Sequence, residues 1–547
     1  MNYPKPIYLK VGWKRSSFRR RLITASKNPS YYNNFNNNKI KIDPIDCKNE
    51  DDFFKNGMKN RSIDDPKRKI LYGFFHPYAN NGGGGEKVLW QAVNATLMTN
   101  DNNIAVIYTV NFEEPAKIIR KVESKFNITL QGERVVFIYL RKFGNLIDSE
   151  YWKHFTLVGQ LIGSVLLAFE CLFELAPDIW IDTIGLPGSY WPISVVLNLP
   201  ILAYVHYPIL QQDMFNKLKF SKMTDLFKFR GEVKDLFKFF YWSILYYVYV
   251  YLGSNVDITL ANGTWTFNHM KKIWFLNEKM GSTLEVLYPP CATEFLNPYK
   301  SKERLNEMIY IAQFRSEKRH DLILTEFSKF LDTCKTEKVP ISKIPKIIFL
   351  GSCRNENDTD CLNSIKSLVT ELELSEYVEF IVDCSYDEIL KQLSTVKFGL
   401  NSMWNEHFGI GVVEYLANGV IPIVHASAGP ILDIATNENS STAESWKSET
   451  GFFFKSSTDP DFSGEMNGDN LVFDNGAFPE LSTLLSDIFA NNKVTENDLD
   501  FMRQVGQGLS NKFSNDEFNT NWRKYTRELA SLEKHYREQR KEVESVY

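Results

Sequence analysis

Residues 74–90 read FFHPYANNGGGGEKVLW and place four consecutive glycines between two well-patterned segments. The segment KILYGFF (69–75) before them is a short apolar run typical of a buried strand. The segment EKVLWQAVNATLM (86–98) after them has the apolar spacing of a helix. The stretch therefore predicts a strand, a glycine loop and a helix in immediate succession, which is the first β-to-α turn of an α/β domain.

The glycine loop consists of Gly82, Gly83, Gly84 and Gly85. Glycine has no Cβ and tolerates positive φ, so backbone N–H groups can converge on an anion at such a helix start. The loop lacks the Gly-Lys-Ser/Thr of a P-loop and the G-x-G-x-x-G spacing of a dinucleotide site. Taken alone, it fits an anion site and a flexible turn equally well.

Short apolar runs alternate with helical segments along most of the chain. A first series is KILYGFF, IAVIYTV, RVVFIYL, DIWIDTI, ILAYVHY and VDITLAN, and a second is MIYIAQF, KIIFLGS, YVEFIVD, VKFGLNS and VIPIVHA. Because these runs are apolar on both faces and separated by helices, they predict parallel sheets with helices on both sides. The predicted fold class is α/β, with two doubly wound, Rossmann-like domains facing each other across a cleft.

The same pattern predicts the domain limits. We expect a basic and then Asn-rich tail and linker over 1–67, a first doubly wound domain over 68–300 and a second over 301–515. Pro289-Pro290 marks a hinge between the two domains. Residues 516–547 are highly charged and predict an exposed terminal helix.

Composition excludes some classes of protein. A chain of 547 residues with 44% hydrophobic side chains can form more than one core. Its net charge of -4 argues against a general nucleic-acid-binding protein, which would carry a strongly basic domain. Its seven cysteines form no C-x-x-C pair, so we expect reduced thiols and a globular part that faces the cytosol.

Three segments suggest contact with a membrane. Residues 1–27 are basic and have no apolar core, so they fit either a disordered tail or one held against an anionic membrane surface. Residues 155–175 are apolar over a nearly spanning length, and residues 239–253 are shorter and rich in aromatics. The aromatic enrichment of 239–253 fits a helix at a membrane interface, the length of 155–175 approaches that of a membrane span, and both segments also fit buried helices of the first domain.

The stretch WNEHFGIGVVEYLANGVIPIV, beginning at Trp404, carries the first candidate site residues. Glu406 lies in a predicted strand-to-helix loop, and Glu414 lies in the helix that follows. Gly409 and Gly411 between them allow the loop to fold closely around a ligand. The apolar neighbours of these two carboxylates disfavour a solvated surface, although plain surface acids are the alternative.

Basic residues and a histidine form a second group of candidates. Arg315, Lys318 and Arg319 follow the first strand of the second domain, at the sheet edge where doubly wound folds bind ligands. An arginine with a lysine suits a diphosphate, and the alternative is a solvated basic loop. His206 lies near the end of the run ILAYVHY, and a histidine taken alone at such a position is more often structural.

In combination, these residues resemble the retaining glycosyltransferases of family 4, which have the GT-B fold. The resemblance covers about residues 68–515 and rests on Glu406 and Glu414 with seven residues between, the Lys318 loop, His206 and the glycine loop. The strings HFTLVGQLIGS, PDIWIDTIG, YVHYPI and MWNEHFGIGVVEYLANGVIPIVHASAGP are similar to the α-1,2-mannosyltransferases that extend the dolichol-linked oligosaccharide.

This resemblance implies GDP-mannose as donor and a dolichyl-diphosphate carrying a mannosylated chitobiose core as acceptor, with two mannoses added in turn. It also implies that the enzyme acts on the cytosolic face of the endoplasmic reticulum membrane and that the first domain faces the acceptor and the membrane. Other mannosyltransferases of the pathway would be its partners. Glu406 and His206 would be catalytic. The donor would be bound by Gly82, Gly83, Gly84, Gly85, Arg315, Lys318, His407, Phe408, Gly409 and Glu414.

No metal or other cofactor is expected, since cationic side chains would do the work of a magnesium ion. Three D-x-D strings each lie in a polar stretch that does not follow a strand end, so they are interpreted as loops and surface acids; they are Asp358-Thr-Asp360, Asp459-Pro-Asp461 and Asp498-Leu-Asp500. The rival functions are a transferase of the same fold that uses a UDP-sugar and a non-catalytic membrane scaffold. The first would be stabilised by UDP-sugars rather than GDP-mannose, and the second predicts a damaged donor site.

Two departures from the family pattern matter. Many members have Gly-Arg where this chain has Ala312-Gln313, so Arg315 is the expected substitute for the phosphate-binding arginine. Members of this subgroup usually begin with a membrane-spanning helix, which is not evident before residue 68. Either the chain start is incomplete or attachment depends on the internal apolar segments.

Overall fold

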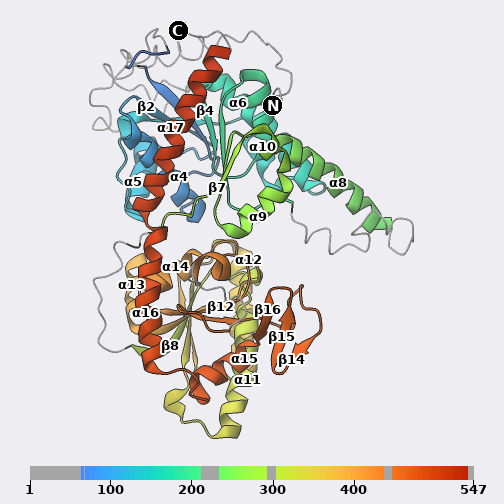
Figure 1. Ribbon diagram of the computed structural model, residues 1–547, viewed down its shortest axis with the longest axis vertical. Helices are drawn as coiled ribbons and strands as arrows, with labels where there is room; N and C mark the ends of the chain where they lie inside the picture. The colour runs from blue at the N-terminus through green and yellow to red at the C-terminus, as the bar shows by residue number, and fades with distance from the viewer. Residues whose placement is uncertain are drawn as a thin grey trace. The chain divides into compact units, whose positions relative to one another are not determined.

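The structure is a computed structural model that describes residues 63–66, 68–210, 233–291, 293, 304–435 and 446–539 (Figure 1). The described chain forms two compact units. Unit 1 runs to Asn262 and also contains Thr266–Pro289 and the chain from Phe518; unit 2 contains Gly263–Trp265 and Pro290–Glu517. The predicted basic tail over 1–27 lies outside the described residues.

Unit 1 is built on a seven-stranded sheet in the order β3-β2-β1-β4-β5-β6-β7, in which every pairing is parallel. The strands are β1 (Ile70–Phe75), β2 (Asn103–Thr109), β3 (Val135–Tyr139), β4 (Ile179–Asp182), β5 (Ile201–Val205), β6 (Ile258–Ala261) and β7 (Thr283–Val286). The first six coincide with the predicted runs. The edge strand β7 was missed because it is short and its residues are only half-buried, so it lacks an apolar run.

Both faces of this sheet are covered, as the doubly apolar strands require. Alternate β1 residues point to opposite sides: Leu71 and Phe75 belong to one core cluster, and Tyr72 and Phe74 to the other. The helices of unit 1 are α4 (Gly84–Thr99), α5 (Pro115–Phe126), α6 (Thr156–Glu174), α8 (Val233–Gly253), α9 (Thr264–Ile273), α10 (Phe275–Met280) and most of α17 (Asn515–Gln539).

The C-terminal segment is helical as predicted, but the expectation that this helix is exposed was wrong. One face of α17 is buried in the core of unit 1 through Phe518, Trp522, Tyr525 and Leu529. The Trp522 indole also donates a hydrogen bond of 2.8 Å to Thr96. Most of the charges occupy the other face, although Glu533 and Arg537 are buried, so a highly charged composition hid an amphipathic helix.

Unit 2 repeats the architecture with a six-stranded parallel sheet in the order β10-β9-β8-β11-β12-β13. Its strands are β8 (Leu305–Ile311), β9 (Lys346–Gly351), β10 (Val378–Val382), β11 (Val396–Asn401), β12 (Ile421–His425) and β13 (Phe452–Phe454). Its main helices are α11 (His320–Glu337), α12 (Glu356–Glu371), α13 (Tyr386–Thr395), α14 (Ile410–Ala417), α15 (Leu481–Leu485) and α16 (Glu496–Ser510). The prediction missed β13 and the small antiparallel sheet of β14 (Met466–Asn467), β15 (Asn470–Phe473) and β16 (Gly476–Pro479).

The apolar segment 155–175 forms α6, which among the described residues is the helix long and apolar enough to cross a membrane by length and composition. It is nevertheless attached to unit 1. The carboxylate of Glu170 accepts backbone hydrogen bonds from Arg141, Lys142 and Phe143 at 2.7, 2.9 and 3.0 Å. A Cβ at Gly163 would overlap the Leu146 carbonyl, so the helix approaches the chain after β3 closely.

The aromatic segment 239–253 lies within α8, which extends away from the sheet of unit 1 (Figure 1). One side of α8 is buried and includes Leu245, Tyr249, Val250 and Leu252. The other side exposes large apolar side chains at helical spacing, and this exposed stripe consists of Phe237, Phe240, Ile244, Tyr247 and Tyr251. A stripe of this kind is typical of a helix that lies at a membrane interface.

Candidate active site

In each unit the strand order changes direction at one point, between β1 and β4 and between β8 and β11. Doubly wound folds bind ligands at the carboxyl ends of the strands next to this point. The predicted site residues follow these strand ends: the glycine loop follows β1, and Lys318 and Glu406 follow β8 and β11. His206 comes directly after β5, one strand further along the sheet of unit 1.

In unit 2 the structure brings Lys318 and Glu406 together. Lys318 Nζ lies 2.5 Å from Glu406 Oε2, and both side chains are mostly buried. The backbone carbonyl of Lys318 accepts hydrogen bonds of 2.8 Å from the hydroxyls of Tyr310 and Ser402, which tie its short helical turn to β8 and to the end of β11. The ammonium group is thus fixed at the sheet edge beside a carboxylate.

The loop that carries Glu406 is held by the end of the next strand. The backbone N–H of Asn405 donates to Ser427 Oγ at 2.8 Å, and the N–H of Gly429 donates to the Glu406 carbonyl at 2.9 Å. The Ser427 hydroxyl lies 2.8 Å from His425 Nδ1. These contacts position the Glu406 backbone independently of its side chain.

Two of the acids in D-x-D strings are structural partners of the basic loop, and the expectation of surface acids was wrong for them. Asp358 is buried in the first turn of α12, and its Oδ1 lies 3.2 Å from Arg315 Nε. Asp459 is also buried. Its Oδ1 lies 2.6 Å from Arg319 Nη1, and its Oδ2 lies 2.8 Å from His425 Nε2. Arg315 remains about one third exposed, so its guanidinium is oriented by Asp358 and still accessible.

The predicted donor residues after Glu406 build the start of α14. Gly409 has φ +103°, a conformation that other residues rarely adopt, and it immediately precedes the helix. The His407 ring lies 4.6 Å from the Trp265 ring, centroid to centroid. Phe408 is buried against Phe513, so only its backbone is available to a ligand. Glu414 is half-buried on the second turn of α14.

In unit 1 the glycine loop ends in the first turn of α4. Gly82 has φ +77°, and a Cβ there would overlap the Lys125 side chain, so glycine is required. The N–H of Gly83 donates to Glu86 Oε2 at 2.6 Å, which closes the loop onto the helix start. A Cβ added to Gly85 would lie 3.7 Å from His206 Nε2, so the loop and His206 are neighbours.

Sequence reasoning missed His76, Glu86 and Thr183 around this loop. His76 Nδ1 lies 2.9 Å from Thr183 Oγ1, and His76 Nε2 lies 3.6 Å from Glu86 Oε1. His206 Nε2 lies 3.1 Å from the Thr183 carbonyl. Two of these residues stand in the quoted glycine-loop segment, and their place directly after a strand and in the following helix was the available signal.

The electrostatics of this cluster favour an uncharged imidazole. Burial, and then the neighbouring His76, lower the pKa of His206 to about 4. Burial raises the pKa of Glu86, but its interactions with His76 and with the Gly83 N–H outweigh this and the net pKa is lowered. At neutral pH His206 is therefore a neutral hydrogen-bonding group beside an ionised Glu86.

The two sheet edges offer different chemistry. Unit 2 presents a lysine, an oriented arginine and a helix N-terminus, which are the groups that bind and stabilise diphosphate oxygens. Unit 1 presents bare backbone and a neutral histidine. Among the described residues, no three His, Cys, Asp or Glu side chains form a group that could hold a metal ion.

Fold and family comparisons agree on the class of protein. Residues 292–467 match the family described as glycosyl transferases group 1. Solved structures with the same fold include sucrose-phosphate synthase from Thermosynechococcus elongatus, with TM-score 0.53 and 10% identity over 85% of this chain and 100% of that chain. Another is α,α-trehalose 6-phosphate synthase from Burkholderia multivorans, with TM-score 0.54 and 9% identity over 85% and 99%. The chain is a GT-B-fold glycosyltransferase, as the sequence predicted.

Relatives of higher identity narrow the class to one family. Residues 69–274 match the family described as ALG11 mannosyltransferase N-terminus. Proteins named GDP-Man:Man(3)GlcNAc(2)-PP-Dol alpha-1,2-mannosyltransferase are 54% identical in Candida albicans, over 100% of this chain and 93% of that protein, and 35% identical in Homo sapiens, over 67% and 75%. The chain belongs to this family of α-1,2-mannosyltransferases, and the predicted resemblance is confirmed.

Proposed function

We propose that this protein transfers mannose from GDP-mannose, in α-1,2 linkage, to a dolichyl-diphosphate-linked oligosaccharide. Membership of the family supports the reaction, because the names of its members specify this donor and acceptor. The observation that carries the proposal is the Lys318–Glu406 pair. The two side chains lie 2.5 Å apart in unit 2, at the strand ends where the strand order changes direction between β8 and β11. It places a cation and a carboxylate where a sugar nucleotide binds in a doubly wound fold.

Unit 2 holds the donor in this proposal. Lys318, Arg315 and the N-terminus of α14 beyond Gly409 receive the diphosphate, and they stabilise the negative charge that grows on it as the bond to mannose breaks. When the donor is bound, Lys318 contacts a phosphate instead of Glu406. Glu406 then binds mannose hydroxyls and stabilises the positive charge that develops on the reacting carbon of mannose. Glu414 binds the ribose hydroxyls, and His407 and the Phe408 backbone line the same site.

Unit 1 contributes the glycine loop and His206 in this proposal. Its glycine loop, Gly82 to Gly85, offers N–H groups and close approach to the transferred sugar and diphosphate. His206 is uncharged at neutral pH because its pKa is lowered to about 4, so it can accept or donate a hydrogen bond to a sugar hydroxyl.

The reaction retains configuration at the transferred carbon. The acceptor hydroxyl approaches on the face that the diphosphate leaves, and an oxygen of the departing diphosphate accepts its proton. The carbon–oxygen bond to diphosphate breaks, and the new bond to the acceptor oxygen forms on the same face. Neither a covalent carboxylate intermediate nor a metal ion takes part, since Lys318 and Arg315 carry the electrostatic role.

The setting we propose is the cytosolic face of the endoplasmic reticulum membrane, where two mannoses are added in turn and other mannosyltransferases of the pathway act beside this protein. The exposed stripe of α8 supports a membrane contact, since it presents Phe237, Ile244 and Tyr247 on one side of the helix. The free cysteines of the described residues suit a reducing compartment.

The test is incubation of the purified protein with GDP-mannose and a synthetic lipid-linked core oligosaccharide, followed by mass and linkage analysis. The expected products carry one and then two additional α-1,2-linked mannoses. Thermal shift with GDP-mannose, compared with UDP-sugars, separates the rival donor class, because the bound nucleotide raises the unfolding temperature. Transfer from a UDP-sugar at a comparable rate, or no transfer with intact binding, would contradict the proposal.

A further inference from the structure

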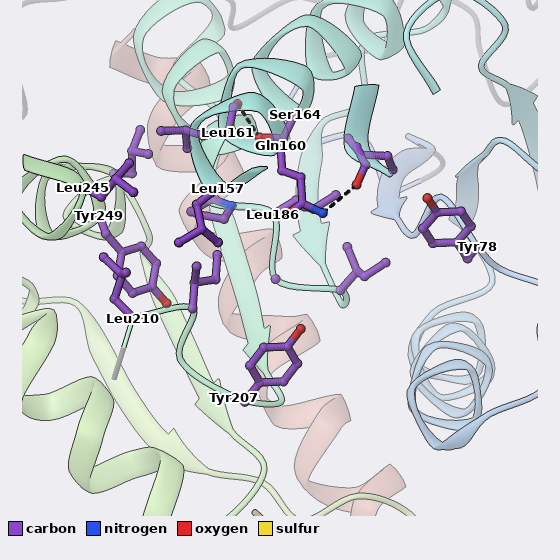
Figure 2. A pocket seen from close by; sticks show the side chains of 16 residues that line it. Tyr78, Leu157, Gln160, Leu161, Ser164, Leu186, Tyr207, Leu210, Leu245 and Tyr249 are labelled. Atoms are coloured by element: carbon purple, nitrogen blue, oxygen red, sulfur yellow. Dashed lines mark hydrogen bonds between the residues drawn. The ribbon is translucent and has the colours of Figure 1, made fainter. Parts of the chain in front are cut away.

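Unit 1 contains a cavity of about 300 Å³ beside the candidate site (Figure 2). Its walls come from α6, from α8 and from the segments after β4 and β5. A cavity of this size is at the lower end of those that hold small organic ligands. The residues that form the proposed donor site in unit 2 do not line it.

The lining is mainly apolar, and polar side chains such as Gln160 and Ser164 of α6 stand among the leucines (Figure 2). Leucines from α6 and α8, together with Leu210, gather at one end with the Tyr249 ring. Three further lining residues follow the carboxyl ends of strands: Tyr78 after β1, Gly185 after β4 and Tyr207 after β5. Tyr207 directly follows His206, and Gly185 comes two residues after Thr183, which contacts both His76 and His206. The end with Tyr78, Tyr207 and Gly185 is thus continuous with the His76, Thr183 and His206 cluster, and the end with Leu245 and Tyr249 leads away from it.

The cavity wall after β4 is fixed by a buried carboxylate. Asp182 accepts the backbone N–H groups of Ile184, Gly185 and Leu186 at 2.9 to 3.0 Å, and the Tyr190 hydroxyl at 2.6 Å. A Cβ at Gly188 would overlap the Ser164 hydroxyl, so this segment is packed directly against α6. A cavity with such walls is already formed before a ligand enters, which lowers the entropic cost of binding.

We propose that this cavity binds the isoprenoid segment of the acceptor that lies next to its diphosphate. The inference rests on the proposed function, which supplies a polyprenyl diphosphate as acceptor. Its apolar chain matches the leucine-lined end, and its charged head lies beyond the end marked by Tyr78 and Gly185, toward the glycine loop, whose backbone N–H groups can receive an anion. Burial of hydrocarbon then contributes binding energy to the acceptor alone and leaves the donor unaffected.

The position of α8 indicates how the chain would leave the cavity. Leu245, Tyr249 and Leu252 on its inner side line the cavity, while Ile244 and Tyr247 lie on its exposed stripe. With the stripe at the bilayer interface, the remaining isoprene units continue along α8 into the hydrocarbon. A phospholipid acyl chain is the competing occupant, and the labelling competition below distinguishes it from the prenyl chain.

The test uses two acceptors with the same oligosaccharide diphosphate, one carrying dolichol and one carrying only a methyl ester. Leu161, half-buried on the cavity wall, is changed to tryptophan to fill the space, and Leu186→Phe narrows the opposite wall. The matched control is Ile162→Trp, one residue away on α6 and exposed. We expect both cavity variants to raise KM for the dolichyl acceptor about tenfold, because they remove part of the binding free energy that burial of the hydrocarbon chain supplies. KM for the methyl acceptor and for GDP-mannose stays at the wild-type value, and the control changes none of these.

A photoreactive prenyl diphosphate gives a readout that does not depend on turnover. In wild type the label should map to residues 157–164, and free dolichyl diphosphate but not phosphatidylcholine vesicles should compete with it. Equal effects on both acceptors, no effect on either, or competition by phospholipid alone would overturn the inference. Absence of mannose transfer to both acceptors by wild type would instead contradict the proposed function, whatever the labelling pattern.

Discussion

The carboxyl edges of the two sheets share a strand order and differ in chemistry. In unit 2, Lys318, Arg315 and Arg319 each meet a carboxylate, and two of the three carboxylates are buried. In unit 1, the corresponding edge carries glycines and two histidines, and burial keeps His206 uncharged. The same sheet arrangement therefore carries paired cations in unit 2, whereas in unit 1 it carries bare backbone and an uncharged histidine beside the ionised Glu86.

The comparison teaches how a GT-B protein can divide its work. A diphosphate needs fixed cations, and cations at a sheet edge need carboxylates that orient them while the site is empty. A sugar and its acceptor need hydrogen bonds and close approach without a net charge. The predictions below test this division, from the largest expected effect to the smallest.

Asp459→Ala should have the largest effect on stability. It removes the carboxylate that pairs with Arg319 and with buried His425, so it leaves polar groups unpaired and should cost about 3–5 kcal/mol of unfolding free energy. Denaturant unfolding measures the loss. The control is Asp500→Ala, an exposed acid from another D-x-D string, which should change stability by less than about 1 kcal/mol. Equal losses of unfolding free energy in the two variants would mean that the contacts of Asp459 with Arg319 and His425 do not stabilise the fold.

Glu406→Ala should reduce kcat about 100-fold or more, in line with removal of one transition-state stabiliser. The fold should survive, because the loop is held through the Gly429 N–H and Asn405 rather than through this side chain. Steady-state transfer from GDP-mannose measures the loss, with exposed Glu465→Ala as control. Turnover near the wild-type rate would remove Glu406 from the mechanism.

Lys318→Ala should impair the same step by a similar factor, since the lysine contacts Glu406 and would stabilise the leaving diphosphate. The two losses should not add, because residues that act as a unit give non-additive effects. A double variant that loses the product of both factors would show that the pair does not work together.

Gly83→Val tests the neutral edge. The residue has φ -94°, so valine is tolerated by the backbone, but its side chain would occupy the loop where close approach is proposed. Transfer should slow about tenfold, since small displacements of a reacting group are costly, while GDP binding by calorimetry is unchanged. Gly508→Val, at an open position of α16, is the control. A loss of GDP affinity larger than the loss of rate would return the loop to a nucleotide-holding role.

The smallest effect concerns pH. Burial lowers the pKa of both His206 and His320 to about 4, below the usual value for histidine of about 6.5. The unfolded chain therefore binds more protons between these values, so stability is fully present above about pH 6.5 and falls as the pH drops toward 4. Thermal unfolding between pH 7 and 5 measures the slope. His320→Phe should flatten it by at most about 1.4 kcal/mol per pH unit, and His206→Gln should flatten it further; an unchanged slope in both variants would contradict these assignments.

Most of the strands were predictable, because a buried parallel strand is apolar on both faces and reads as a continuous run. The strands that escaped, β7 and β13, are short and stand at sheet edges, where half the side-chain surface is free of this constraint. The terminal helix α17 was found, but its burial was not, since only its docking on unit 1 distinguishes its buried aromatic face from an exposed one.

The candidate site divides in the same way. Glu406, Lys318 and the glycine loop were visible because each follows a strand at a spacing that a family shares. Asp358, Asp459 and Thr183 were not, since each acts through a partner at least 43 positions away along the chain. A carboxylate in a polar stretch looks the same whether it faces water or a guanidinium.

The sequence by itself determined the α/β class, the doubly wound type of its two domains and the residues at the strand ends, because hydrophobic periodicity and strand-to-helix turns are local properties of the chain. Tertiary structure alone decided which charges became pairs, that His206 is uncharged, and that the apolar α6 is attached to unit 1 through Glu170. It also turned the segment FFHPYANNGGGGEKVLW from an open loop into a neighbour of His206, because burial and partnership depend on residues that only the fold brings together.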